Sequence, residues 1–217
     1  PGLAQYKEPA IRESEQANID RWFVASKRKV QNWHYSCWPA DKTKAPYQYP
    51  HVLQRFYQEN RDKLVGTFIN GVKDHWPRQH VSLYCWMKLL WSPDFDVDAA
   101  IDAYCQRMYG PAAATMKELV TLQTTRWEQS RWLNGRMSPK AIYEQCFPRP
   151  VYDRMFALLA QARSEAADTA EAAAHVAYYA KPFQAFQTEF EAVVEGKGAH
   201  ALTALKAADD PLIDGRL

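Results

Sequence analysis

Aromatic side chains that could stack on a sugar or another ring-shaped ligand gather around two short segments of this chain. Tyr35 and Trp38 belong to the first segment, residues 30–39, and Trp76 follows the second, residues 65–71. Aromatic faces pack on the apolar faces of ligands, which favours a binding cleft here. The chain holds eight Trp, twelve Tyr and nine Phe, so a core filled with the same rings is the alternative interpretation.

Charged and metal-ligating side chains near these segments are few. Asp74 and His75 follow the second segment, and His34 lies in the first. A lone Asp after a strand is more often an N-cap or turn residue than a ligand contact, and both interpretations stay open for Asp74. The four cysteines form no CxxC pair and the histidines have no zinc-site spacing, so no metal site is predicted. Nucleotide-binding glycine motifs are absent from the sequence, and no cofactor is predicted.

The elements that position these residues follow from the hydrophobic periodicity. Residues 11–27 predict an amphipathic helix and residues 30–39 a strand leading into a loop. The apolar stripe of residues 52–64 predicts a second helix, and residues 65–71 a second strand. Strand, helix and strand in this order predict a βαβ unit, with parallel strands joined by a right-handed crossover.

Parallel pairing would bring the two strand ends to one side of a sheet. Trp38, Asp74 and Trp76 are then expected on that same side. Two strands do not form a stable sheet alone, so more strands or a covering layer are expected. Two βα units followed by helices look like the closing units of a (β/α)8 barrel, although they could also end an open sheet.

A run of apolar residues at positions 81–91 predicts a helix that is apolar nearly all round. Such a helix is normally buried between layers. Four of its side chains, Trp86, Leu89, Leu90 and Trp91, are therefore expected to be mostly buried and to join the βα units to the helices that follow.

The rest of the chain is helical in pattern, with clear boundary signals. Asp96 is a predicted N-cap, and Gly110 offers a left-handed cap. Ser138 precedes a proline and opens a short helix. A break is expected at Pro182, at the end of an alanine-rich run, and the tail 206–217 is expected to be loose.

These elements predict a mainly α protein with a small β component. Residues 1–92 are assigned to the last βα units of a (β/α)8-type barrel, and residues 93–217 to an α-helical array. The formal net charge is +2 and no basic block stands out, so nucleic acid is not an expected partner. No apolar run approaches the roughly 20 residues of a membrane span.

One stretch resembles the signature of a known family. The string LLWSPDFDVDAAIDAYCQRMYGPAA resembles the pattern of a bacterial domain-of-unknown-function family, whose members show "akLlWnPd-D-d-li-dF---yYG-AA". The matching residues are Leu89, Leu90, Trp91, Pro93, Asp94, Asp96, Tyr109, Gly110, Ala112 and Ala113. Upstream, the order of elements agrees from about residue 14: a helix with Trp22, a strand ending in His34 and Tyr35, a Pro-Tyr-Pro-like loop and a Gly-containing strand.

The resemblance implies a carbohydrate-active protein. Such proteins are similar to α-glucuronidases and hexosaminidase-like glycosidases, in which a TIM barrel is followed by helices, and they are usually exported to the periplasm or the extracellular space. The family's larger members carry the earlier barrel strands, so the upstream part of the same protein is an expected partner. Asn70 stands where members often carry an acidic residue.

The catalytic requirement of a glycosidase is only partly met. Glycoside hydrolysis uses two carboxyl groups roughly 5 to 10 Å apart. Asp74 is the best-placed acid at a strand end, whereas Asp41 lies in a Lys-rich loop. The isolated chain is therefore expected to be inactive and its catalytic residues stay unassigned. The predicted substrate-binding residues are His34, Tyr35, Trp38, Asp74 and Trp76.

Two other interpretations stay open. The chain could be a non-catalytic helical interaction module or carbohydrate-binding module, because a binding module would use the same aromatic residues. It could also be a structural domain of unrelated function. A native gene with several hundred further upstream codons would favour the glycosidase interpretation.

Overall fold

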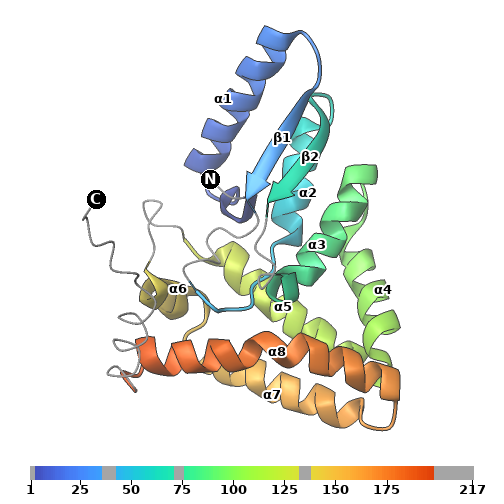
Figure 1. The fold of residues 1–217 in the computed structure, drawn as a ribbon, viewed down its shortest axis with the longest axis vertical. Coiled ribbons are helices and arrows are strands. Elements are labelled where there is room, and N and C mark those ends of the chain that lie inside the picture. The colour runs from blue at the N-terminus through green and yellow to red at the C-terminus, as the bar shows by residue number, and fades with distance from the viewer. Residues whose placement is uncertain (1–2, 36–42, 71–75, 132–137, 198–217) are drawn as a thin grey trace, which may run out of the picture.

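The computed structural model describes residues 3–35, 43–70, 76–131 and 138–197, and these residues are mainly helical (Figure 1). The strands are β1 (Val30–Tyr35) and β2 (Leu64–Asn70). The helices are α1 (Pro9–Ser26), α2 (Pro50–Asn60), α3 (Trp76–Trp91), α4 (Val97–Tyr109), α5 (Ala113–Gln129), α6 (Pro139–Cys146), α7 (Arg149–Glu165) and α8 (Ala170–Val193). Short 3-10 helices cover Leu3–Gln5 and Gly110–Ala112. The mainly α fold with a small sheet is confirmed, and the tail 206–217 lies outside the described residues.

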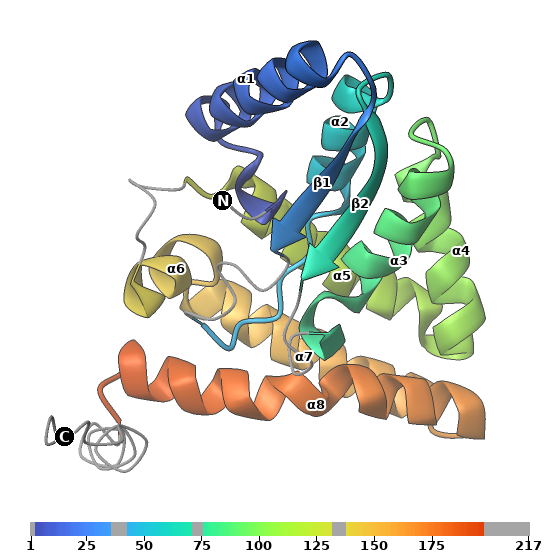
Figure 2. The same cartoon turned by 45° about the horizontal axis from the view of Figure 1, so that its top comes forward.

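The two strands form a parallel pair, and α2 is the helix that crosses between them. Their register sets Trp33 beside Phe68 and Tyr35 beside Asn70. Among the described residues neither strand has another neighbour. The predicted parallel pairing is confirmed. Both arrows point toward the place where α3 begins (Figure 2).

The helices surround the sheet unevenly. One face of the strand pair packs on α2, while α1 lies beside β1 and α3 lies on the β2 side (Figures 1 and 2). Helices α5, α6, α7 and α8 lie on the side to which the strands point, with α7 and α8 packed together across that end, while α4 lies beside α3. The strand ends therefore face the helical array.

The apolar core is densest in this helical array. Phe190 of α8 stacks on Tyr152 of α7 with ring centroids 4.2 Å apart. Trp127 of α5 stacks on Tyr47 at 4.3 Å and donates its indole N–H to the carbonyl of Ala4 at 3.0 Å. One continuous cluster of buried side chains includes residues on both sides of position 92. The predicted domain boundary at that position stays a prediction.

The helix boundaries predicted at Asp96, Gly110 and Ser138 are confirmed. The Asp96 carboxylate accepts the backbone N–H of Ala99 at 2.9 Å and caps α4. Gly110 ends α4 at a φ of 47°, which side chains rarely tolerate. The Ser138 hydroxyl accepts the N–H of Ala141 at 3.2 Å and caps α6.

The expected burial of the α3 side chains is correct only in part. Leu89 is buried, and Trp86 is partly buried with its indole N–H donating to the Tyr57 hydroxyl at 2.7 Å. Leu90 and Trp91, however, are 39% and 91% exposed, so the prediction is wrong for them. The reason is geometric, because α3 contacts α2, α4 and α8 and none of these covers the side that carries Leu90 and Trp91.

The expected break at Pro182 is also wrong. Helix α8 runs through Pro182 without interruption, and the chain instead reverses in the turn between α7 and α8. A proline inside a helix removes one backbone hydrogen bond. The side chains of Tyr179 and Phe183 on either side of Pro182 are buried, and this packing on both halves offsets the loss.

Candidate functional site

The carboxyl ends of the two strands bring together part of the predicted site. Tyr35 ends β1 with 48% of its surface exposed, beside Asn70 at the end of β2. Trp76 begins α3 and is 41% exposed. Trp38 and Asp74 lie outside the described residues. The structure therefore places two of the predicted aromatic residues at exposed positions close to the strand ends.

One face of the sheet carries exposed aromatic side chains, and we call it the open face. Alternation along the strands puts Gln31, Trp33 and Tyr35 of β1 on this face. Trp33 and its register partner Phe68 meet edge to face with ring centroids 4.7 Å apart, yet they are 60% and 49% exposed. Parallel sheets are normally covered on both faces. The open face is therefore unusual for a finished sheet.

His34, a predicted substrate contact, lies on the opposite face. It is buried against α2, with its ring 4.7 Å from that of Phe56. Burial lowers the pKa of His34 to about 3, so the imidazole is neutral at physiological pH. Its Nε2 atom has no hydrogen-bond partner among the described residues. This histidine packs the back of the strand and does not reach the open face.

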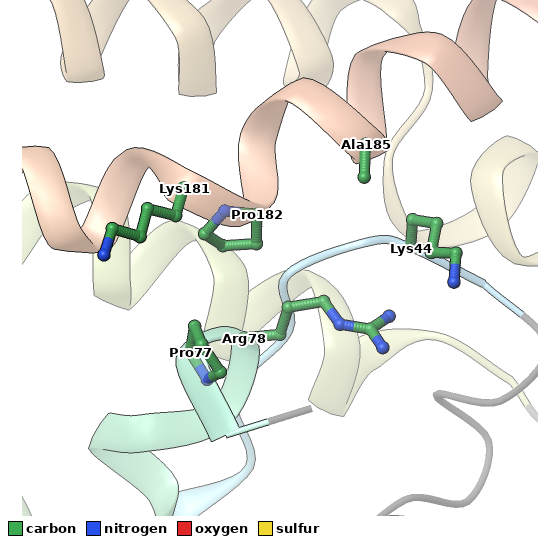
Figure 3. A pocket seen from close by; sticks show the side chains of 6 residues that line it. All are labelled: Lys44, Pro77, Arg78, Lys181, Pro182 and Ala185. Carbon is green, nitrogen blue, oxygen red and sulfur yellow. The ribbon is translucent and has the colours of Figure 1, made fainter. Parts of the chain in front are cut away.

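A pocket of about 250 Å³ opens beside the first turn of α3 (Figure 3). Its lining combines side chains of the loop after β1, of α3 and of α8, namely Lys44, Pro77, Arg78, Lys181, Pro182 and Ala185. Pro77 and Pro182 lie across from each other, and the amino groups of Lys44 and Lys181 point toward opposite ends of the pocket (Figure 3). The pocket thus has apolar walls and a cationic rim.

The chemistry that this pocket can offer is limited. The buried Arg78 donates to the carbonyl of Thr43, and the Lys181 amino group lies 5.0 Å from the centre of the Tyr178 ring. Among the described residues no carboxylate lines the pocket. It could hold a small group of negative or partly negative charge, but it supplies no acid–base pair. Sequence reasoning missed it because Lys44, Arg78 and Lys181 come from three separate segments.

A buried polar network fixes the loop after β1 to α3. The Gln48 side chain donates to the carbonyl of Arg78 at 3.1 Å and accepts the N–H and the hydroxyl of Ser82 at 3.0 and 2.8 Å. The Tyr49 N–H donates to the Ser82 hydroxyl at 2.8 Å. Buried polar groups that are paired in this way hold their elements in one arrangement. The pocket wall is therefore built on a rigid contact.

A second contact fixes the same loop to α8. The Glu189 carboxylate accepts the Lys44 N–H, the Tyr143 hydroxyl and, at 3.3 Å, the Thr43 hydroxyl. Burial, together with this carboxylate, raises the pKa of Tyr143 well above its ordinary value, so it stays a donor. Glu189 is thus engaged in holding the loop.

A larger pocket of about 500 Å³ lies between α1 and β1, along the free edge of the sheet. Its lining residues are Glu15, Asn18, Ile19, Trp22, Val30, Gln31 and Asn32. Trp22 is 70% exposed, and burial raises the pKa of Glu15. The Nδ2 atom of Asn32 is buried without a hydrogen-bond partner in the described part of the chain. Polar and apolar groups are both left incompletely covered here.

Metal-ligating clusters and membrane-spanning helices are both absent from the described part of the chain. The described ranges hold no group of three or more His, Cys, Asp or Glu side chains that could bind a metal ion. Cys85, Cys105 and Cys146 are buried free thiols, and burial raises the pKa of each. Within these ranges no helix is long and apolar enough to cross a membrane.

Comparison with known families gives one match. Residues 6–120 match the family described as Domain of unknown function (DUF4838), and the chain belongs to this family. The matched region contains both strands, all of α3 with its exposed end, and all of α4. It ends inside α5. The resemblance to a domain-of-unknown-function family is therefore confirmed. No curated protein and no solved structure matches the chain.

Proposed function

We propose that this member of the DUF4838 family is the C-terminal portion of a carbohydrate-active, glycoside hydrolase-like protein. In this proposal α1, β1, α2, β2 and α3 belong to the last units of a (β/α)8-type barrel, and the helical array follows them. The resemblance to glycosidase-like proteins supports the enzyme class, and it alone supports export to the periplasm or the extracellular space.

The observation that carries the proposal is the pair of exposed aromatic rings near the carboxyl ends of two parallel strands. Tyr35 and Trp76 both present large exposed surfaces there. Active sites of (β/α)8 barrels lie at this end of the strands. Aromatic rings in such positions stack on the apolar faces of sugar rings. A carbohydrate is therefore the ligand class that these side chains fit best.

We assign the substrate contacts to the strand ends. Tyr35 and Trp76 are proposed to contact the sugar, together with Trp38 and Asp74, which lie outside the described residues. His34 was predicted with this group, but it packs on α2, so its proposed part is to hold the end of β1 in place.

Catalysis is proposed to need the upstream part of the same protein. Two carboxyl groups must face the glycosidic bond roughly 5 to 10 Å apart. Asp74 is the acid that the sequence places best for this role, and one carboxylate cannot perform both steps. The chain alone is therefore expected to bind a sugar weakly and to hydrolyse none, while the upstream part supplies the missing carboxylate.

A binding experiment tests the ligand class. A panel of oligosaccharides is titrated calorimetrically into the 217-residue chain and into the full-length protein. Trp76→Ala should weaken binding by about tenfold, since a stacking surface is lost. The matched control is Tyr178→Ala, which removes an exposed ring of α8 and should change nothing. Equal losses in both variants, or no saccharide binding at all, would refute the proposal.

A turnover measurement tests the enzyme class. Aryl glycosides and aldouronic acids are offered to both proteins, with Asp74→Asn as the variant. We expect turnover by the full-length protein alone, lost in the variant. Turnover by the chain itself, abolished by Asp74→Asn, would place the active site wholly within it. Binding without turnover in the full-length protein would favour the alternative, a non-catalytic helical interaction or carbohydrate-binding module.

A further inference from the structure

The pocket beside the first turn of α3 brings three cationic side chains together. Lys44 comes from the loop after β1, Arg78 from α3 and Lys181 from α8. The Arg78 side chain extends toward the Lys44 side of the pocket, while the Lys181 amino group lies toward the other end (Figure 3). Among the described residues that line the pocket, none carries a negative charge. The lining therefore favours an anionic ligand.

The backbone of α3 adds to this positive charge. The helix spans Trp76–Trp91, and its first turn supplies Pro77 and Arg78 to the pocket lining. The N-terminus of a helix carries a partial positive charge that stabilises negative groups within the first turn. The helix end and the cationic side chains thus act in the same direction.

The two lysine amino groups are not neutralised by carboxylates of the chain. In the described part of the chain neither Lys44 nor Lys181 forms a salt bridge. Glu189 lies close to Lys44, but its carboxylate accepts the Lys44 backbone N–H and the hydroxyls of Thr43 and Tyr143. The Lys44 side chain therefore keeps its charge available at the pocket.

The walls of the pocket indicate what carries the negative charge. Pro77 and Pro182 lie across from each other, and Ala185 extends the same apolar wall (Figure 3). A bare inorganic ion would leave these walls in water, whereas an organic ligand would cover them with its own apolar atoms. The volume of about 250 Å³ is below the roughly 300–1,000 Å³ of sites for drug-sized ligands. A small organic acid fits both the volume and the walls.

The pocket wall is held in place before any ligand binds. Arg78 is 3% exposed, and its guanidinium donates to the carbonyl of Thr43. The Gln48 amide donates to the Arg78 carbonyl at 3.1 Å, and Gln48 also accepts from Ser82. A site fixed in this way binds its ligand without the cost of ordering its own side chains and loop.

We propose that this pocket binds the carboxylate group of a small organic acid. The Lys44 amino group pairs with the carboxylate, and the fixed charge of Arg78 attracts it to the same end. Pro77 and Pro182 pack on the apolar body of the acid, while Lys181 adds its charge from the other end. This inference does not rest on the proposed function, because every residue in it belongs to the described part of this chain.

A titration with three matched probes tests the ligand class. Pentanoate has the charge and the apolar body, pentanamide has the body alone, and inorganic sulfate has the charge alone. Binding to the 217-residue chain is followed by calorimetry. Pentanoate should bind about tenfold or more tightly than either of the others, because it alone combines a charge-assisted hydrogen bond with apolar contact. Equal binding of pentanamide or of sulfate, or no binding of pentanoate, would overturn the proposal.

Three lysine variants locate the site. Lys44→Met should weaken pentanoate binding by about tenfold, and Lys181→Met, whose charge lies further from the carboxylate, by about threefold. The matched control is Lys88→Met, which removes the same charge from the last turn of α3. All three lysines are exposed, so the melting temperatures should stay unchanged. An equal loss in Lys88→Met would show that net charge and not the pocket attracts the acid, and would overturn the proposal.

A sugar acid identifies the source of the carboxylate. A hexuronate that binds more tightly than pentanoate, with the difference lost in Trp76→Ala, would place the carboxylate on the saccharide of the proposed function. Tighter binding of pentanoate would identify a free organic acid. Loss of neutral oligosaccharide binding would refute the proposed function and leave this inference standing, whereas hexuronate and pentanoate binding that Lys44→Met leaves unchanged would overturn it.

Discussion

The helical array and the sheet region use the same large side chains in opposite environments. Trp127 and Phe186 are buried in the array, whereas Trp33 and Trp91 of the sheet region remain largely exposed. Helices of the array have neighbours on several sides, and their apolar faces are covered within the chain. Among the described residues the strand pair has no further partner strand at either edge, and one of its faces carries exposed rings. A two-stranded sheet on its own is at most marginally stable in water.

This difference shows that an apolar sequence pattern predicts buried side chains only where the residues that cover them are present. In the array the residues that cover each other all lie in this chain. In the sheet region the covering residues are missing from the described part of the chain, and large rings stay exposed although their sequence looks like that of a core. In the proposed function, these exposed rings are the surfaces that the upstream part of the protein would cover.

Truncating one large side chain in each region tests whether the two regions differ in how much their aromatic residues stabilise the chain. Phe186→Ala should destabilise the chain by about 3–5 kcal/mol, because it leaves a cavity in a closed core. Trp33→Ala should cost less than about 1 kcal/mol, since most of its surface is already in water. Urea unfolding of the chain measures both. Similar losses for the two variants would remove the distinction between the regions.

A second comparison uses two tryptophans of the same helix. Trp86→Ala should cost about 2 kcal/mol, because a half-buried ring and its hydrogen bond to Tyr57 are lost. Trp91→Ala, the matched control, should change the stability of the chain by less than about 0.5 kcal/mol. Thermal and urea unfolding check both values. A larger loss for Trp91→Ala would mean that its exposed position in α3 is wrong.

A substitution at the N-terminus of α4 should have a smaller effect on stability. Asp96→Ala should destabilise the chain by about 1 kcal/mol, because the first turn of α4 loses its cap. The neighbouring Asp94→Ala removes only an exposed ion pair with Arg61 and should cost less than about 0.5 kcal/mol. Helical content and urea midpoints are the measurements. Equal costs would show that the cap contributes no more than a surface charge.

The smallest expected effect is the pH dependence of the contact that joins α2 to the array. Hydrogen bonds that the His51 ring donates to the carboxylates of Glu128 and then Asp98 raise the pKa of His51 to about 9, from an ordinary 6.5. A raised pKa means that the stabilisation is complete below pH 6.5 and is lost as the pH rises to about 9. His51 is partly exposed, so its contribution is below about 1 kcal/mol.

The measurement is the melting temperature at pH 6 and pH 9.5 for the wild type and for His51→Gln. The wild type should lose more stability than the variant between these two pH values, because the variant has no charge to lose. An equal loss in both proteins would assign the pH dependence to other groups.

Much of the fold could be predicted because its signals are local. The caps at Asp96, Gly110 and Ser138 depend on one residue type and its neighbours, and the structure confirms them. The parallel pairing followed from the helix between the strands. At the strand ends, Tyr35 and Trp76 are exposed, and their predicted contact with a substrate stays a prediction.

The remaining features depend on contacts between distant segments. Nothing local shows that α3 lacks a neighbour beside Leu90 and Trp91, or that packing around Pro182 keeps α8 continuous. The cationic pocket escaped prediction because Lys44 and Lys181 meet only through the fold of the array. His34 was predicted to contact a substrate, but it is one of the alternate residues of β1 that face α2. Which set of alternate residues faces α2 is decided only when the strands pair and pack.

The most direct test of the central claim, that the sheet region is completed by the rest of the protein, is hydroxyl-radical footprinting of single tryptophans. Oxidation of Trp33, Trp91 and Trp127 is quantified by mass spectrometry in the 217-residue chain and in the full-length protein. We predict that Trp33 and Trp91 react readily in the chain and fall to the low level of the buried Trp127 in the full-length protein. If Trp33 and Trp91 stay as reactive in the full-length protein as in the chain, the claim is contradicted.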